Sequence, residues 1–427
     1  MNKSYQAVAM GVRRKPLLKI FPVIAFALLA SWTAPADAFV KHRHPEAAAK
    51  KSAEEAPPVP LTGIHVLGDR PAPFALNAKA VMLIDANTGA VLYSYNEHQK
   101  MQPASLAKIM TFYLALDAMK AGKLTPATDV IISEKAWRLS MDDTVSRMFL
   151  QVGQKVAAND LLYGLMVSSG NDAAVALAEY LGGSADGFTT MMNDKAAELH
   201  LTETHFQNPD GLPAEGEFTT AADMVTLAHS LIRHHPEALT YTSAKEFVFD
   251  KIKQPNFNSL LFHDARVNGI KTGHVSEAGY HLVASAQSNG MTLISAVMGT
   301  PSEIKRRDET EKLLDWAFRA FVSYKPDLHK ALPATIPVHD GVKETVAIGP
   351  AGDAVFTLGR GEESKVTLAF TPSVRYVEAP VNPGTQVGDL AVMLNSNPQS
   401  SIAIVTKSGV ARAGFFGRLG QKIRRML

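Results

Sequence analysis

The chain contains no cysteine among its 427 residues. Disulfide bonds, thiolate nucleophiles and zinc sites built on cysteine are therefore excluded. The chain also lacks a long hydrophobic run near its start, because residues 20–32 give only thirteen apolar-type positions, interrupted by Pro22, against roughly 20 needed to span a bilayer. The histidines show no metal-ligand spacing, and we find no internal repeats. We therefore expect neither a metal nor another cofactor.

The formal net charge of +2 is unevenly distributed along the chain. Residues 1–38 and the tail from Ala411 are both basic, so the body between them is acidic. An acidic body argues against nucleic acid as a partner. A length of 427 residues with 46% hydrophobic content is sufficient for one large core and a smaller second domain.

The N-terminus has the pattern of a secretory signal peptide. Basic residues up to Lys19 precede the apolar run, and Ala36-Asp37-Ala38 follows it as a small-x-small cleavage site. We expect residues 1–38 to be a signal peptide, although an uncleaved membrane anchor is the alternative. Residues 39–60 are rich in Lys, Glu, Ala and Pro without apolar periodicity, which predicts a flexible leader.

Residues 61–325 show the pattern of an α/β domain whose sheet is assembled from both ends of the segment. Two apolar runs flank the turn at residues 87–89, which predicts a hairpin. A helix is expected to open at Pro103 and to end at Gly122. Further helices are predicted over residues 160–167, 172–181, 186–199, 220–234 and 303–322, and further strands over 280–287 and 291–298. Thr220 and Asp223 are expected to form a capping box.

Beyond Tyr324 the chain consists of short β-type runs broken by Pro, Gly and Asn, which predicts a small all-β domain over residues 332–408. The expected strands are residues 345–348, 355–358, 365–370, 375–377, 386–394 and 402–406.

The tail, residues 411–427, has the pattern of an amphipathic helix. Its apolar residues fall near one helical face, and its basic residues cover the rest. This arrangement predicts a helix that lies on an anionic membrane surface without spanning it. The alternative is a disordered basic end, because Gly414, Gly417 and Gly420 weaken helix propensity.

Three short motifs contain residues suited to acyl transfer. In the first, Ser105 and Lys108 lie three positions apart at a helix start, which places hydroxyl and amine on one face. A hydroxyl nucleophile needs a base, and lysine can act as one if burial and a second cation lower its pKa. The pattern alone is weak, since Ser302 and Lys305 have the same spacing.

The second motif is Ser169-Gly170-Asn171, between two predicted helices, where a loop can direct a hydroxyl and an amide into a cleft. Its alternative is a simple helix N-cap, and Ser94-Tyr95-Asn96 matches the same pattern. The third motif is Lys271-Thr272-Gly273, where the later strands begin. Its Lys and Thr can bind a substrate carboxylate, and its Gly lets a substrate backbone approach.

Taken in order, the three motifs resemble those of the serine penicillin-binding proteins and β-lactamases. The flanking residues narrow the resemblance to the low-molecular-mass penicillin-binding proteins, the serine-type D-alanyl-D-alanine carboxypeptidases of peptidase family S11. These flanking segments are residues 103–108, 169–173, 208–212 and 269–274. The resemblance implies a β-lactamase-like catalytic domain followed by the all-β domain. It also implies removal of the terminal D-alanine from peptidoglycan stem peptides through an acyl-serine, with β-lactams as inhibitors.

The resemblance implies a catalytic role for each of five residues. Ser105 would attack the carbonyl between the two D-alanines, and Lys108 would accept its proton. Ser169 would relay a proton to the departing D-alanine, and Asn171 would hold the substrate amide and the lysine. Lys271 would supply the positive field that keeps Lys108 neutral.

The resemblance also implies the substrate-binding residues. Thr272 in the Lys271-Thr272-Gly273 motif would bind the terminal carboxylate, and the backbone N–H groups of the nucleophile and His274 would form the oxyanion hole. Arg306 is expected to be a further cation for that carboxylate, with Arg307 as the alternative.

Other functions stay open on the same scaffold. A D,D-endopeptidase or a β-lactamase would use the same chemistry, although no segment between Ser169 and Lys271 matches the glutamate loop of class A β-lactamases. A non-catalytic cell-wall peptide-binding protein is a third alternative. The expected location is the periplasm, with peripheral attachment to the inner (cytoplasmic) membrane.

Overall fold

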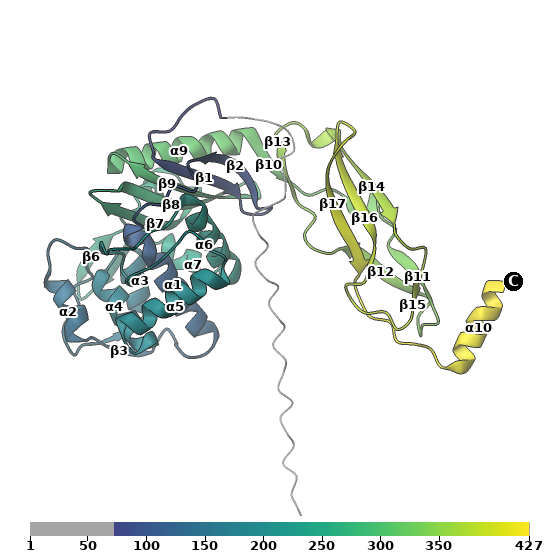
Figure 1. Ribbon diagram of the computed structural model, residues 1–427, viewed down its shortest axis with the longest axis horizontal. Coiled ribbons are helices and arrows are strands. Elements are labelled where there is room, and N and C mark those ends of the chain that lie inside the picture. The colour runs from purple at the N-terminus through teal and green to yellow at the C-terminus, as the bar shows by residue number, and fades with distance from the viewer. Residues whose placement is uncertain (1–71, 427) are drawn as a thin grey trace, which may run out of the picture. The chain divides into compact units, whose positions relative to one another are not determined.

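The first part of the described chain is built on one five-stranded antiparallel sheet. The computed structural model describes residues 72–426, so the predicted signal peptide and leader lie outside the described residues. The five strands have the order β2-β1-β9-β8-β7 (Figure 1). They are β1 (Ala80–Asp85), β2 (Ala90–Tyr95), β7 (Val267–Val275), β8 (Gly279–Ser288) and β9 (Met291–Thr300). The sheet therefore joins the two ends of the segment, as the sequence predicts.

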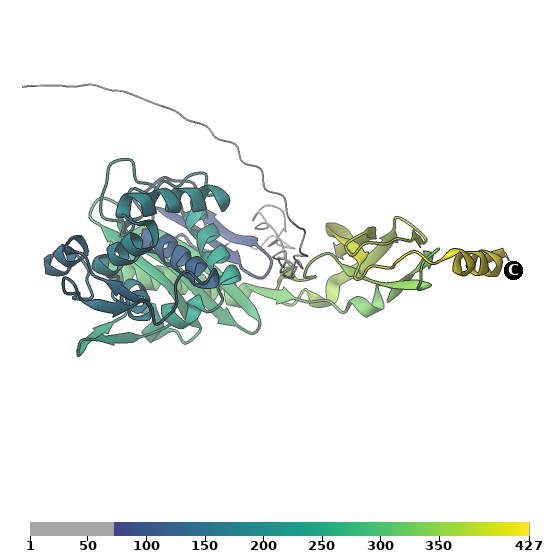
Figure 2. The same ribbon diagram turned by 90° about the horizontal axis from the view of Figure 1, so that it is seen from below.

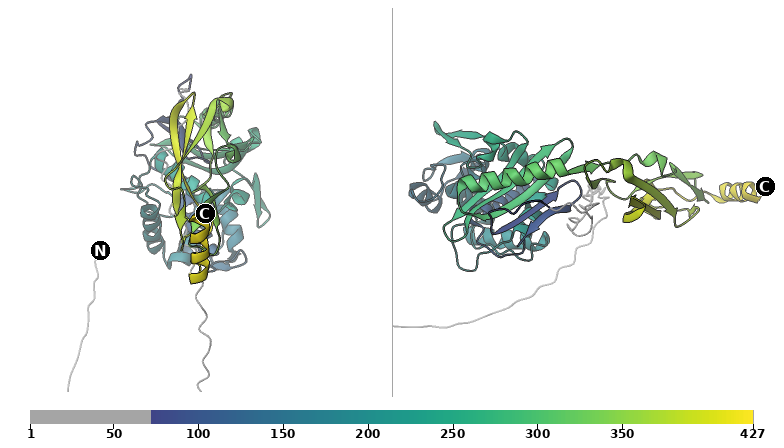
Figure 3. Two further views of the ribbon diagram at one scale, coloured as in Figure 1. Left: turned by 90° about the vertical axis from the view of Figure 1, so that its right-hand side faces the viewer. Right: turned by 90° about the horizontal axis from the view of Figure 1, so that it is seen from above.

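Helices cover both faces of this sheet. Met82 and Ile84 of β1 belong to the larger core, with α1 (Lys108–Lys120) and α6 (Ala221–His234), whereas Val81 and Leu83 belong to a second core under α9 (Glu303–Ala320). Alternate residues of a strand point to opposite faces, so a strand covered on both faces is apolar throughout. Figure 3 shows α9 running across the sheet.

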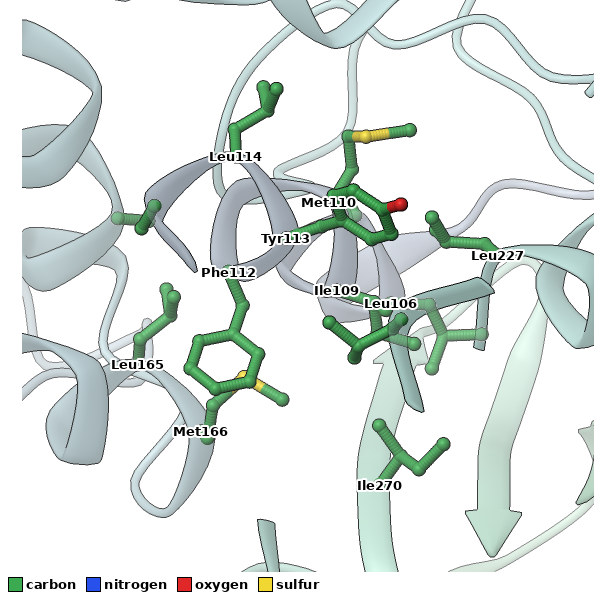
Figure 4. Close-up of a cluster of buried hydrophobic side chains, with 14 of the residues drawn as sticks. Leu106, Ile109, Met110, Phe112, Tyr113, Leu114, Leu165, Met166, Leu227 and Ile270 are labelled. Carbon is green, nitrogen blue, oxygen red and sulfur yellow. The ribbon is translucent and has the colours of Figure 1, made fainter. Parts of the chain in front are cut away.

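The larger core is mainly helical and surrounds α1. In Figure 4, Phe112 of α1 lies beside Leu165 and Met166, and Ile109 lies near Leu227 and Ile270. The remaining elements are η1 (Ala104–Ala107), α2 (Glu134–Met141), α3 (Ala158–Met166), α4 (Asn171–Gly182), α5 (Ala185–Glu198), α7 (Ala238–Thr242), α8 (Leu260–His263) and the two-stranded ladders β3 (Asp129–Ile131) with β4 (Lys155–Ala157) and β5 (Glu246–Phe249) with β6 (Ile252–Pro255). Helix α1 is therefore anchored by apolar contacts from several elements.

The predicted helices are present, with differences at their ends. The helix expected at Pro103 begins as the 3-10 turn η1 before α1, and Gly122, at φ 70°, follows its end. Thr220 caps α6 by accepting from the Asp223 N–H at 3.1 Å. The capping box is wrong, however, because the Asp223 carboxylate accepts from the Glu203 N–H and the Thr204 hydroxyl instead.

One further expectation needs correction, and one helix was missed. The closing helix ends at Ala320 and not at residue 322, because Phe321 begins the strand β10 (Phe321–Tyr324), which pairs with β13 (Phe356–Gly359). Helix α2 was not predicted. Its sequence mixes charged and apolar residues over only eight positions, too few for the helical period to stand out.

The C-terminal segment forms an all-β domain, as predicted. Its six-stranded sheet has the order β14-β16-β17-β12-β11-β15, green to yellow in Figure 2. The strands of this sheet are β11 (Thr335–His339), β12 (Thr345–Pro350), β14 (Val366–Pro372), β15 (Val377–Glu378), β16 (Gln386–Leu394) and β17 (Asn397–Thr406). Strand β13 pairs with β10 in a separate two-stranded sheet, and the 3-10 turns are η2 (Leu328–Lys330) and η3 (Glu363–Lys365). Strand β11 was not predicted, because its Pro337 weakens the strand pattern.

Helix α10 (Phe415–Met426) follows this domain and is hydrogen-bonded to it. Gln421 Nε2 donates to the Gly341 carbonyl at 2.7 Å, and Arg424 pairs with Glu344 at 3.1 Å. The side chains of Phe415, Phe416, Leu419 and Ile423 are exposed, and Phe416 is 85% exposed. Within residues 72–426, no helix combines the length and the apolar character that crossing a membrane requires.

Candidate active site

The predicted nucleophile lies in a strained turn. Ser105 belongs to η1, and the preceding residue, Ala104, has φ 50°. Ser169 also has a positive φ, of 55°. A left-handed conformation costs roughly 1–2 kcal/mol for a residue other than glycine, so the surrounding structure must hold both backbones in place. Such strain is often found at functional sites.

The amine of Lys108 contacts the nucleophile directly. Its Nζ lies 2.8 Å from Ser105 Oγ, and it donates to Asn171 Oδ1 at 2.6 Å and to the Asp210 carbonyl. The side chain is fully buried. Burial lowers the pKa of Lys108 to about 8, although the nearby carboxyls of Asp210, Asp172 and Glu217 oppose this change.

One of those carboxyls, Glu217, opposes it only weakly. Burial raises the pKa of Glu217 to about 8, so this group is largely uncharged near neutral pH. Burial also raises the pKa of Asp210. Because the pKa of Lys108 itself is about 8, part of the Lys108 population is neutral near neutral pH and can accept a proton.

Lys271 is a second buried lysine in the same site. It lies on β7, and its Nζ donates to the Thr272 carbonyl at 2.9 Å. Burial lowers its pKa well below the ordinary value, and the positive charges of Lys108 and Arg306 lower it further. We expected Lys271 to lower the pKa of Lys108, but burial is the largest cause there. The state in which both lysines are charged is disfavoured.

The second motif is not a side-chain helix cap. Gly170 is the N-cap of α4 and makes no side-chain bond, so the hydroxyl of Ser169 does not serve as a cap. Ser302, which shares its spacing to Lys305 with the first motif, is such a cap: its hydroxyl accepts from the Lys305 N–H at 3.1 Å. The structure thus distinguishes the Ser105 and Ser169 motifs from the Ser302–Lys305 pair, which is an ordinary helix cap.

The predicted residues surround one cavity of about 300 Å³. It is lined by Ser105, Thr144, Val145, Ser146, Ser169, Asn171, Gly211, Leu212, Pro213, Phe257, Thr272, Gly273, His274, Val275, Tyr280, Glu303 and Arg306. The buried amines of Lys108 and Lys271 lie behind this lining. Arg307, the alternative cation, pairs instead with Asp308 at 2.7 Å.

Arg306 is held beside the cavity by three neighbours. Its Nη2 donates to the Phe257 carbonyl at 3.1 Å and to Glu303 Oε1 at 3.3 Å, and its guanidinium lies 5.9 Å from the centre of the Tyr280 ring. Burial lowers the pKa of Arg306, and the Glu303 charge partly reverses this change. A buried cation at this position suits a carboxylate ligand.

Gly273 packs closely against the turn that carries Ser105. A Cβ at this position would lie 3.0 Å from the Pro103 carbonyl and 3.3 Å from Leu106. The missing side chain therefore lets β7 approach this turn, and Gly273 also lines the cavity.

Sequence reasoning missed two supports of this site. The Asp210 carbonyl binds Lys108, and Thr111 Oγ1 donates to the Pro209 carbonyl at 2.6 Å. The Asp172 carboxylate accepts from the Ser140 hydroxyl at 2.6 Å and the Met148 N–H at 3.0 Å, which fixes the loop that lines the cavity. Residues 208–212 were identified only as a flanking segment of the resemblance. The role of the Asp210 carbonyl could not be predicted, because every residue has a backbone carbonyl.

A serine hydroxyl in contact with a buried lysine amine, with a second buried lysine and a buried arginine nearby, defines a serine hydrolase that forms acyl-enzymes. The D-alanyl-D-alanine carboxypeptidase model of peptidase family S11 matches residues 68–302, and the penicillin-binding protein 5 C-terminal domain matches residues 327–412. The chain therefore belongs to the D-alanyl-D-alanine carboxypeptidase family S11.

Individual relatives agree with this assignment. D-alanyl-D-alanine carboxypeptidase DacC of Escherichia coli K12 is 39% identical over 348 residues, which cover 81% of this chain and 87% of the relative. DacF of Bacillus subtilis is 32% identical over 354 residues, 82% and 90% of the two chains. The structure of penicillin binding protein 5 from Haemophilus influenzae aligns with a TM-score of 0.73 at 37% identity, covering 81% of this chain and all of that one.

The contact between Gly211 and the nucleophile turn can be tested by substitution. A Cβ at Gly211 would lie 1.9 Å from the Ala104 carbonyl, so Gly211→Ala must displace the turn. We expect about a tenfold or larger loss in the rate of penicillin acylation, because small misplacements of a reacting group are costly. Gly216→Ala is the matched control, since its φ is 79° and its Cβ meets only the flexible Gln207 side chain. Equal acylation rates in the two variants would refute the contact's importance.

Proposed function

We propose that this hydrolase removes the terminal D-alanine from peptidoglycan pentapeptides with Ser105 as nucleophile and Lys108 as base. The observation that carries the proposal is the 2.8 Å contact between the two side chains, with the amine fully buried. A neutral amine at this distance can accept the hydroxyl proton as the oxygen attacks.

The reaction then proceeds in two halves. Ser105 Oγ bonds to the carbonyl carbon between the two D-alanines while its proton passes to Lys108. The C–N bond breaks, Ser169 relays a proton to the departing amine, and D-alanine leaves. Water hydrolyses the acyl-serine and restores the hydroxyl. The oxyanion of each half is held by the backbone N–H groups of Ser105 and His274.

The lining residues supply the binding contacts. Thr272 and Arg306 are the groups we assign to the terminal carboxylate, since both are buried beside the cavity. Asn171 holds the lysine through Oδ1, which leaves its amide nitrogen to face the substrate backbone. A β-lactam presents a carboxylate and a reactive amide to the same groups, so it acylates the same serine.

The proposal predicts D-alanine release from a pentapeptide that ends in D-Ala-D-Ala. Ser105→Ala should abolish both release and covalent labelling by penicillin, because no nucleophile remains. Ser94→Ala, which changes an exposed serine on β2, should leave both unchanged. If the wild type is labelled but releases nothing from the pentapeptide, a D,D-endopeptidase is the better assignment; if Ser105→Ala is still labelled, the nucleophile is another residue.

We further propose that the protein is exported to the periplasm and attaches through α10 to the anionic face of the inner membrane. The exposed apolar side chains of α10 and its basic residues support this attachment. The contacts of Gln421 and Arg424 with the β domain involve the polar side of the helix and leave Phe415 and Phe416 exposed.

Binding to lipid vesicles tests the attachment. Phe416→Ser should weaken sedimentation with anionic vesicles about tenfold, because an exposed Phe contributes most of its apolar area to insertion. Cleavage of a soluble pentapeptide should not change. Tyr376→Ser alters an exposed aromatic residue of the β domain outside the helix and is the control. Undiminished binding of Phe416→Ser would contradict the proposal.

A further inference from the structure

Glu303 places a carboxylate beside Arg306, the residue expected to bind the terminal carboxylate of the substrate. It lies in the first turn of α9, one helical turn before Arg306, and it lines the same cavity as Ser105. Its side chain is 57% exposed, so it faces the solvent-filled cavity and is not part of the core. None of the sequence motifs includes this residue.

Glu303 and the Phe257 carbonyl bind the same nitrogen of the Arg306 guanidinium. Within the described residues, both hydrogen bonds of Arg306 leave from Nη2, to Glu303 at 3.3 Å and to the Phe257 carbonyl at 3.1 Å. Arginine has five N–H donors, so Nη1 and Nε are available to a ligand carboxylate. A bound terminal carboxylate would therefore lie across one guanidinium group from Glu303.

The balance of charge in this part of the cavity follows from these contacts. Among the cavity-lining residues that the structure describes, Glu303 is the one acid and Arg306 the one strong base. The negative charge of Glu303 already balances the positive charge of Arg306. A bound terminal carboxylate therefore makes the net charge of these three groups negative. Neither buried lysine pairs with Glu303, because the Lys108 amine bonds Ser105, Asn171 and the Asp210 carbonyl, and the Lys271 amine bonds the Thr272 carbonyl.

We propose that Glu303 is a specificity-determining residue that selects, by charge, the side chain of the terminal D-residue. Neutral and cationic side chains are accepted, and an acidic side chain is repelled by Glu303 together with the terminal carboxylate. Phe257, which is exposed and lines the same cavity, offers contact to the aliphatic part of a longer side chain. This inference rests on the proposed carboxypeptidase function.

Two pentapeptides that differ only in a terminal D-Gln or D-Glu test the proposal, because the two side chains have the same shape and different charge. For the wild type we expect kcat/KM for D-Gln to exceed that for D-Glu about fivefold, the size typical of a partly exposed charge pair. Glu303→Gln keeps a hydrogen-bonding side chain and should bring the ratio close to one. Glu311→Gln, on the same helix but outside the cavity lining, removes the same charge and should leave the ratio unchanged.

The possible results distinguish failure of the Glu303 proposal from failure of the carboxypeptidase assignment. If Glu303 serves only as a counterion that orients Arg306, Glu303→Gln lowers kcat/KM for both peptides equally, and the unchanged ratio overturns the proposal. A ratio that falls equally in Glu311→Gln would also overturn it, since the effect would then reflect net charge. Failure of the carboxypeptidase assignment is distinguishable, because the wild type would then release no D-alanine from the standard D-Ala-D-Ala peptide.

Discussion

The burial of the Lys108 amine is the constraint on which the rest of the catalytic site depends. Transferring an ammonium group out of water is costly unless its pKa falls or its protons are hydrogen-bonded, and this site does both. Asn171 and the Asp210 carbonyl accept from the amine, and burial lowers its pKa to about 8. Burial of the lysine destabilises the folded state, and the same burial allows the lysine to act as a base at neutral pH.

Three separate parts of the chain enclose that amine. Helix α4 contributes Asn171, the loop at residues 208–212 contributes a carbonyl, and β7 contributes Lys271. The parts approach closely, because Gly211 and Gly273 lack side chains where the turn of Ser105 lies against them. Tight packing of this kind explains how the positive φ of Ala104 is maintained: the turn has no room to relax.

The sequence was sufficient to predict the residues of the motifs. It was insufficient to predict the groups that hold those residues in place. Ser105, Lys108 and Arg306 have side chains whose type and spacing indicate chemistry, and the structure places all three at one cavity. The Asp210 carbonyl could not be found, because every residue has one. Glu303 was missed because an acid in the first turn of a helix usually only stabilises the helix. The hairpin and the long helices were predictable from apolar spacing, whereas short α2 and proline-containing β11 were not.

The pH dependence of penicillin acylation tests the central claim, that neutral Lys108 is the base. The neutral fraction grows as pH rises through the pKa, so the rate should increase about tenfold per pH unit in the acidic range and level off above about pH 8. Because Lys108 and Lys271 repel each other, the midpoint belongs to the pair. A rate that is constant between about pH 6 and pH 10, or one that rises only near the ordinary lysine pKa of 10.5, would contradict the account.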